Sequence, residues 1–188
     1  MKLYNLHTQE WLCEESLGYY ISRIFPDSVN NKQFLNYKFR PDYVSHEHKT
    51  VIEYNGDRHY TKADSCIRDL IKMGICHDHG YKFIQFPYFM QITPNILEKL
   101  FGNICTNMEQ FEYLDFPQGF ISKNCVLPAD FCTIGIQRFK QDLKYIRENF
   151  GENVERDIIL SLERRSEIKD IVYHIECYME DEYNFYLY

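Results

Sequence analysis

The chain has 188 residues, of which 45% are hydrophobic, 16% aromatic and 26% charged, and its formal net charge is −7. So apolar a composition excludes a disordered chain, and the length suits one compact domain with a helical addition. Because no run of about 18 uncharged apolar residues occurs, we expect neither a transmembrane helix nor a membrane partner.

The N-terminal residues and the cysteines both favour an intracellular protein. Residues 1–7 lack the long apolar core of a secretory signal. The seven cysteines are scattered and form no C-x-x-C pair, a pattern typical of a reducing compartment. We therefore expect a cytoplasmic protein, or a nuclear one if the source is eukaryotic.

The first hundred residues alternate between helical and strand patterns. Apolar residues at helical spacing predict a helix over 8–24, with Thr8 as its cap. After a loop at 26–31, two short strands are predicted over 39–44 and 50–54. The polar turn 45–49 joins these strands into a hairpin.

A second helix is expected over residues 62–79 and a third strand over 81–86. Gly80 sits where a C-terminal glycine belongs, and the helix's apolar stripe consists of Ile67, Leu70, Ile71, Gly74 and Ile75. Thr93 and Pro94 then open a further helix that Gly102 closes. This order predicts an α+β fold, within the broad α/β class, in which a small mixed sheet is flanked by helices.

The second half of the chain has weaker patterns. Ordered loops are predicted at 116–120 and 127–131, and helices at 137–150 and 154–162; residues 171–179 fit both helix and strand. We interpret residues 1–105 as the core domain and 106–188 as a partly helical extension with an acidic tail. Residues 152–188 contain ten acidic and four basic residues, against eight acidic and nine basic in 37–101. The negative charge therefore belongs mainly to the tail.

Two carboxylates stand out in the predicted hairpin. Asp42 lies on its first strand and Glu53 ends its second, after Val51 and Ile52. Cross-strand neighbours have Cβ atoms about 5 Å apart, and two carboxylates that close repel each other unless a cation lies between them. Mg²⁺ or Mn²⁺ prefers such hard oxygen ligands, and the backbone carbonyl of Tyr54 could supply a third.

These residues resemble the PD-(D/E)XK nuclease superfamily, and most closely its very-short-patch-repair-like endonucleases. Those families show R-P-D-F-V, I-E-x-D-G-x-x-H, D-x-x-R and G-Y-x-V-x-x-F in this order. The chain has Arg40-Pro41-Asp42-Tyr43-Val44, Ile52-Glu53-Tyr54-Asn55-Gly56-Asp57-Arg58-His59, Asp64-Ser65-Cys66-Ile67-Arg68 and Gly80-Tyr81-Lys82-Phe83-Ile84-Gln85-Phe86. The resemblance covers roughly residues 38–88 and implies a restriction-endonuclease-like core.

The resemblance also implies roles for single residues. Asp42 and Glu53 would be catalytic metal ligands, joined by an acid of the first helix, for which Glu14 is our candidate and Glu10 and Glu15 are rivals. The catalytic set would be completed by the residue at the motif's lysine position and a histidine, which are Asn55 and His59.

Asparagine at this position removes the positive charge of the motif lysine. Lys62, His59 or Lys38 could supply it from another element. Arg40, Arg58 and Lys62 are the candidates for contacts with nucleic-acid phosphates.

The sequence thus predicts a Mg²⁺-dependent endonuclease that hydrolyses phosphodiester bonds of DNA rather than RNA. A second hypothesis is a catalytically degraded module that binds nucleic acid, because the RAP domain associated with RNA binding has a similar fold and motif. A third is an interaction or inhibitor protein that uses its acidic, tyrosine-rich C-terminal tail.

Overall fold

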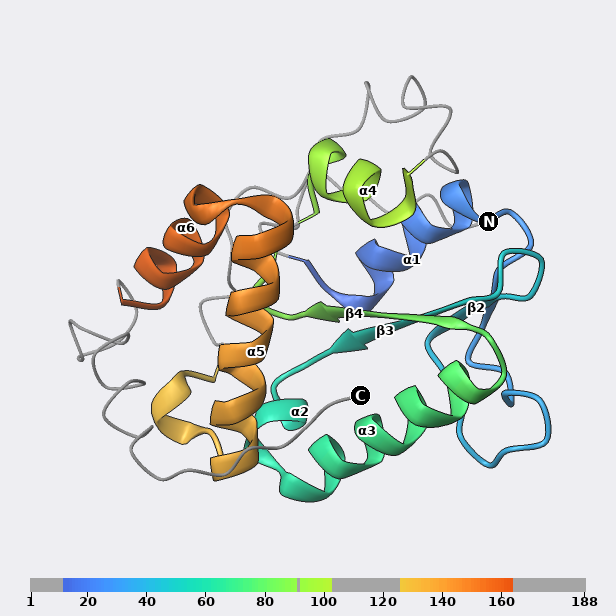
Figure 1. Cartoon of the computed structure of the whole chain (residues 1–188), viewed down its shortest axis with the longest axis horizontal. Coiled ribbons are helices and arrows are strands. Elements are labelled where there is room, and N and C mark those ends of the chain that lie inside the picture. Colours follow the sequence, from blue (N-terminus) through green and yellow to red (C-terminus); the bar gives the residue numbers. More distant parts are fainter. Residues whose placement is uncertain (1–11, 91, 103–125, 164–188) are drawn as a thin grey trace.

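The computed structural model describes residues 12–90, 92–102 and 126–163, which include a four-stranded sheet with helices on both faces (Figure 1). The strands lie in the order β1-β2-β3-β4. They are β1 (Val29–Asn30), β2 (Tyr43–Ser45), β3 (Thr50–Asn55) and β4 (Lys82–Pro87). Only the pair β3–β4 is parallel within this sheet. The predicted mixed sheet flanked by helices is confirmed.

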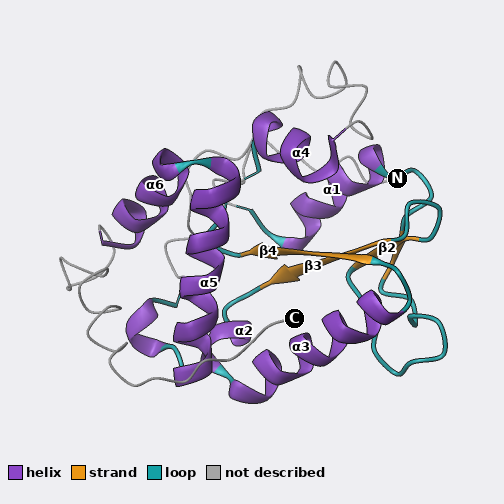
Figure 2. Ribbon diagram, in the orientation of Figure 1, coloured by secondary structure: helices purple, strands orange, loops and turns teal. Residues whose placement is uncertain are grey.

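The helices surround the sheet on three sides (Figures 1 and 2). α1 (Glu14–Ile24) and α4 (Pro94–Phe101) lie over one face, and α3 (Ala63–Asp78) lies over the other, after the single turn α2 (Arg58–Thr61). α5 (Thr133–Phe150) crosses the end of the sheet where β3 and β4 finish, and α6 (Glu152–Glu163) packs beside it. A 3₁₀ turn at Pro128–Asp130 precedes α5.

The predicted hairpin is present, with two differences from expectation. β2 begins at Tyr43 and not at residue 39, because Pro41 lacks a backbone N–H and interrupts strand pairing. The segment 26–31, expected as a loop, contains the two-residue strand β1, which pairs with β2 through Val29 and Val44. A strand so short leaves no alternating pattern from which to predict it.

Side chains on the two faces of the sheet enter different cores. Tyr43, Ile52 and Ile84 belong to the larger core, which contains residues of α1, α4 and α5. Val44 and Val51 belong to a smaller core with Cys76 of α3. Because side chains alternate along a strand, Glu53 faces the same side as Val51, towards α3. The side chain of Glu53 on β3 therefore points towards α3, and α3 must supply its counter-charge.

Helix α3 occupies the predicted position, but the prediction of its buried face was wrong. Ile67 and Ile71 are 47% and 57% exposed. The residues of α3 that face inwards are Ser65, Cys66, Asp69 and Cys76. The reason is that the sheet side of α3 carries the partner groups of Glu53, so polar residues are buried there and part of the apolar stripe is not.

The remaining helix boundaries follow local signals. Thr93 caps α4 by accepting a hydrogen bond from the Ile96 N–H, and Gly102 follows its end with a φ of 54°. α5 begins at Thr133, earlier than predicted, after Cys132, whose sulfur accepts from the Gly135 N–H. Both α5 and α6 confirm predicted helices. The proposed cap Thr8, the loop 116–120, residues 171–179 and the part of the acidic tail after residue 163 lie outside the described residues.

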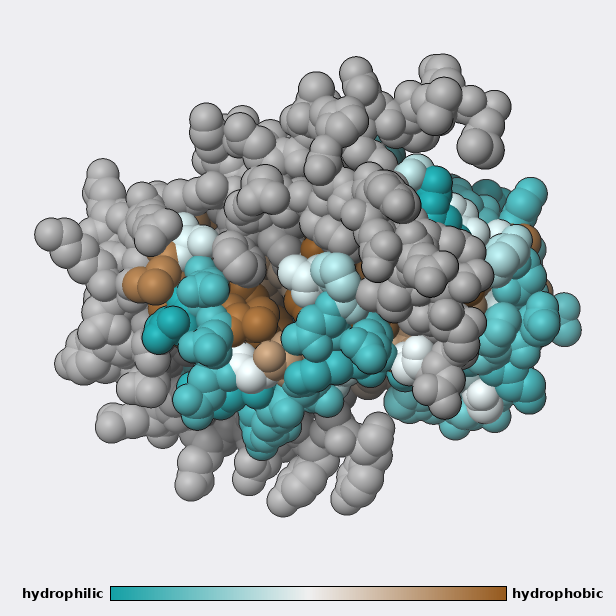
Figure 3. Space-filling view, turned by 90° about the horizontal axis from the view of Figure 1, so that it is seen from above, coloured by the Kyte–Doolittle hydropathy of each residue, from teal (hydrophilic) through white to brown (hydrophobic). Residues whose placement is uncertain are grey.

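The surface seen in Figure 3 is mainly hydrophilic where its residues are described, with hydrophobic atoms showing at the left and near the centre. Within residues 12–90, 92–102 and 126–163, no helix is both long and apolar enough to cross a membrane.

We predict that Gly135→Ala strongly destabilises the fold. A Cβ at residue 135 would overlap the Tyr60 carbonyl group, which lies where α5 meets α2. Because both sides of this contact are backbone, overpacking should lower the free energy of unfolding by about 3 kcal/mol. Chemical denaturation measures this change. Gly74→Ala is the matched control, because nothing lies within 4 Å of its Cβ position. Alanine should stabilise α3 by up to about 1 kcal/mol.

If Gly135→Ala were as stable as the wild type, the close contact between α5 and α2 would be contradicted.

Candidate active site

The hairpin register brings Asp42 and Glu53 together. Tyr43 pairs with Ile52, so the same antiparallel register, continued by one residue, sets Asp42 opposite Glu53. The Tyr54 N–H donates a hydrogen bond to Asp42 Oδ2 at 2.7 Å, which fixes this carboxylate beside the end of β3. Directly opposite residues project to the same face of a sheet. Glu53, only 3% exposed, therefore shares a buried face with Asp42.

A lysine of α3 neutralises Glu53. Lys72 Nζ donates to both carboxylate oxygens of Glu53 at 3.0 Å and lies 3.8 Å from Asp69 Oδ1. This cation was missed from the sequence, where Lys62, His59 and Lys38 were the candidates. Lys62 and Lys38 are exposed in the structure. The signal that could have found Lys72 is its helical spacing from Asp69 and Cys76 on one face of α3.

Asp69 is the centre of a second set of contacts. It is 4% exposed, and its Oδ2 lies 2.5 Å from His59 Nδ1 and 2.5 Å from Arg138 Nη1. Burial alone would raise the pKa of Asp69, but the hydrogen bond from His59 and the Arg138 guanidinium hold it below its ordinary value. A carboxylate accepts, so His59 donates from Nδ1 and its Nε2 is left to accept a proton.

Arg138 ties α5 to this site. Its guanidinium lies over the Tyr60 ring at 5.2 Å, and the Tyr60 hydroxyl donates to Asp142 Oδ2 at 2.7 Å. The Cys132 N–H donates to the Tyr60 carbonyl at 3.0 Å, next to the close contact made by Gly135. α5, assigned from the sequence to the C-terminal extension, therefore supplies a side chain that holds Asp69 and, through it, His59.

Burial and nearby charges shift the pKa values of the carboxylates. Burial, followed by the nearby charge of Asp42, raises the pKa of Glu53 to about 7, although Lys72 opposes the shift. Burial also raises the pKa of Asp42 above its ordinary value, against the Tyr54 hydrogen bond and Lys72. In Glu14, burial and then the charge of Asp42 raise the pKa. The pair Asp42–Glu53 thus holds negative charge that is only partly compensated.

The other predicted residues occupy different settings. Glu14 begins α1 and is exposed; it is near enough to Asp42 to affect its charge, but Glu14, Asp42 and Glu53 do not all lie within 4.8 Å of one another. Asn55 is fully buried at the end of β3, and neither polar atom of its amide has a partner among the described residues.

The three residues proposed to contact phosphates, Arg40, Arg58 and Lys62, are exposed, as Glu14 is.

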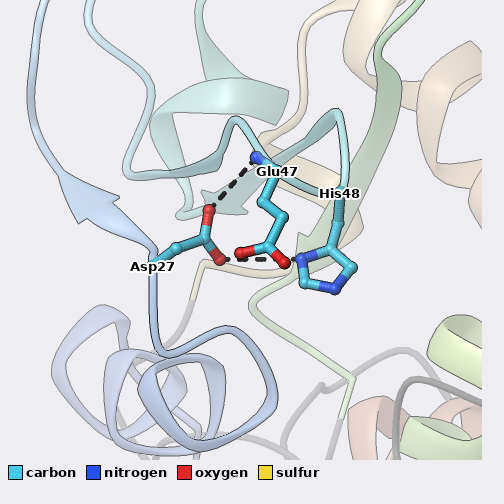
Figure 4. A group of neighbouring side chains, drawn as sticks. All are labelled: Asp27, Glu47 and His48. Atoms are coloured by element: carbon cyan, nitrogen blue, oxygen red, sulfur yellow. Dashed lines mark hydrogen bonds and ion pairs between the residues drawn. The ribbon is translucent and has the colours of Figure 1, made fainter.

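A different group of metal-binding residue types meets at the hairpin turn. Asp27, Glu47 and His48 each offer a ligand atom, and these atoms all lie within 4.8 Å (Figure 4). Asp27 accepts hydrogen bonds from the Glu47 N–H at 3.2 Å and from the Ser45 hydroxyl at 2.9 Å, and it lies 3.6 Å from His48. These contacts fasten the turn to the segment after α1 and account for the cluster.

Comparison with protein-family models, curated proteins and solved structures gives no match for this chain. The resemblance to PD-(D/E)XK nucleases therefore rests on the sequence motifs alone.

We predict that Asp142→Asn makes stability less dependent on pH. Burial raises the pKa of Asp142 to about 6 from an ordinary value of 3.8. A raised folded-state pKa means that stability is fully present below the unfolded pKa and is lost as pH rises through the folded one. This difference corresponds to about 3 kcal/mol at most.

Asparagine carries no charge and can still accept the Tyr60 hydrogen bond. We therefore expect the free energy of unfolding of Asp142→Asn minus that of the wild type to be larger at pH 8 than at pH 4. Urea denaturation at the two pH values measures this difference. If this difference were the same at both pH values, the raised pKa of Asp142 would be contradicted.

Proposed function

We propose that the chain is a metal-dependent endonuclease that hydrolyses phosphodiester bonds of DNA. The observation that carries this proposal is the arrangement of Asp42 opposite Glu53, with Lys72 bonded to both oxygens of Glu53. A buried carboxylate, a half-buried carboxylate and a half-buried ammonium group at a sheet end are expensive to hold together for stability alone. Their chemistry suits a phosphodiester and a cation.

The residues present fit Mg²⁺ or Mn²⁺. Both carboxylates are hard oxygen ligands. Burial raises the pKa of each, and the charge of Asp42 also raises that of Glu53, which a divalent cation would oppose. The buried Asn55 amide, with no partner in the described part of the chain, adds unused hydrogen-bonding capacity next to Glu53. Asp42 and Glu53 would hold the ion. When bound, such an ion polarises a phosphodiester oxygen and makes water a better nucleophile.

The protein's own groups have distinct tasks in this proposal. Lys72 replaces the positive charge missing at Asn55 and donates to a phosphate oxygen as negative charge develops there. His59 accepts the proton of the attacking water at Nε2, while Asp69 holds its Nδ1–H. Arg138 is a positioning residue, because it donates to Asp69 and to the carbonyl oxygen of His59 and is assigned no contact with the reacting atoms.

Exposed cations support a polyanionic substrate. Arg58 and Lys62 flank the turn that carries His59, and Arg40 precedes Asp42 by two residues. Such side chains can contact phosphates on either side of the scissile bond. The net charge of −7 does not oppose this, since the acidic excess lies after residue 151.

One observation favours the second hypothesis, a module that binds nucleic acid without cleaving it. The ion pair with Lys72 already compensates Glu53, and Asn55 carries no charge. In such a module the pair would only stabilise the fold. A cleavage assay separates the two hypotheses, because only the enzyme requires the carboxylates and a divalent cation for product formation.

We predict that Glu53→Gln lowers Mg²⁺- or Mn²⁺-dependent cleavage of plasmid and single-stranded DNA by about a hundredfold or more, because the amide keeps the volume but loses the charge that holds the ion. Glu98→Gln, at an exposed position of α4, is the matched control and should cleave like the wild type. Circular dichroism confirms folding. Full activity in a folded Glu53→Gln variant would place the catalytic acid elsewhere.

We also predict that Lys72→Met lowers kcat by about a hundredfold, whereas Lys72→Arg retains part of it. Methionine removes the charge that we assign to transition-state stabilisation, and arginine restores a cation on the same helix. Single-turnover kinetics at saturating DNA separates this effect from weaker binding. A Lys72→Met variant that loses stability but keeps its kcat would limit Lys72 to a structural role.

A further inference from the structure

A cavity of about 410 Å³ lies between α3, β4 and α5, beside the candidate active site. Its aliphatic walls come from all three elements, and they include Leu70 and Met73 of α3, Ile84 of β4 and Ile134 of α5. Asp69, which holds His59, also lines it. The cavity and the site of proposed hydrolysis therefore share one wall.

The exposed stripe of α3 contributes to this cavity. Ile67, which sequence periodicity places in a core, is 47% exposed and lies on the cavity wall with Leu70. An exposed isoleucine leaves apolar surface in contact with water, which is unfavourable. A flat ligand between α3 and α5 would cover this surface.

The polar residues that line the cavity include three amides, beside the charged residues Asp69, Lys82, Arg138 and Asp142. Gln85 comes from β4, and Gln137 and Gln141 lie one turn apart on α5. None of these three amides has a hydrogen bond to another described residue. Each can therefore offer both a donor and an acceptor to a ligand. The adjacent carboxylate of Asp142 already binds Tyr60.

We infer that this cavity binds one unpaired nucleobase of the DNA strand whose backbone lies at Asp42 and Glu53. Aliphatic walls suit the two faces of a base, and amides suit the donor and acceptor pattern of its edge. The volume exceeds that of one base, as a pocket that also admits the sugar requires. This inference rests on the proposed function and names its substrate as DNA with an unpaired nucleotide, either single-stranded or extruded from a duplex.

Binding of DNA that contains 2-aminopurine tests the inference. The full chain is titrated, in Ca²⁺, with a fully paired duplex, a duplex with one unpaired 2-aminopurine, and a single strand. The double variant Gln137→Leu/Gln141→Leu removes two amides at similar volume. Asn149→Leu makes the same exchange on an exposed part of α5 and is the control.

The wild type and the control should bind the unpaired duplex about tenfold more tightly than the paired one, with a change in 2-aminopurine fluorescence. The double variant should lose this preference and the fluorescence change, while its affinity for the paired duplex stays the same. Tighter binding of the single strand than of the unpaired duplex identifies single strands as the source of the base. The reverse order identifies extrusion from a duplex.

Equal affinity of the wild type for paired and unpaired DNA, with metal-dependent cleavage intact, would overturn the pocket and leave the proposed hydrolysis standing. A double variant that keeps the preference would also overturn it, because the base would then bind elsewhere. Absence of both DNA binding and cleavage would reject the proposed function together with this inference.

Discussion

The buried carboxylate of Asp69 is the constraint on which the arrangement of this protein depends. An ionised carboxylate inside a protein is strongly destabilising unless hydrogen-bond donors and positive charge surround it. Asp69 receives both from two different elements, His59 at the single turn α2 and Arg138 on α5, while Lys72 lies 3.8 Å away. Loss of any of these partners would leave buried charge uncompensated, so the three helices are fixed relative to one another.

This constraint links a structural network to the proposed chemistry. The sheet presents Asp42 and Glu53 at the end of β3, and α3 covers them with Lys72. On the same face of α3, Asp69 orients His59 so that one ring nitrogen remains open. The two carboxylates, the ammonium group of Lys72 and the imidazole of His59 thus lie at one end of the sheet. Helix α5 is part of this arrangement, since Arg138 holds Asp69 from outside the residues that resemble nucleases.

Local patterns were sufficient to predict the hairpin, the mixed sheet and the pairing of Asp42 with Glu53, since strand alternation and turn residues act over short distances. Lys72 and Asp69 were missed because charged residues on a helix normally face solvent. Here α3 packs against a sheet that carries the buried carboxylate of Glu53, and its charged residues face inwards. Arg138 lies 69 residues from Asp69, and no local spacing predicts such a contact. The two-residue strand β1 carries no periodicity at all. The role of Asn55 depends on burial, which its sequence neighbours do not reveal.

Binding of Mn²⁺, followed by isothermal titration calorimetry and electron paramagnetic resonance, tests most directly whether Asp42 and Glu53 form a metal centre. The wild type should bind one ion per chain at pH 8, and Asp42→Asn should weaken this binding at least about tenfold. Substituting Asp27 in the hairpin-turn cluster should leave the same site unchanged. A wild type that binds no Mn²⁺, or an Asp42→Asn variant that binds it with the same affinity, would contradict the proposed metal-dependent site.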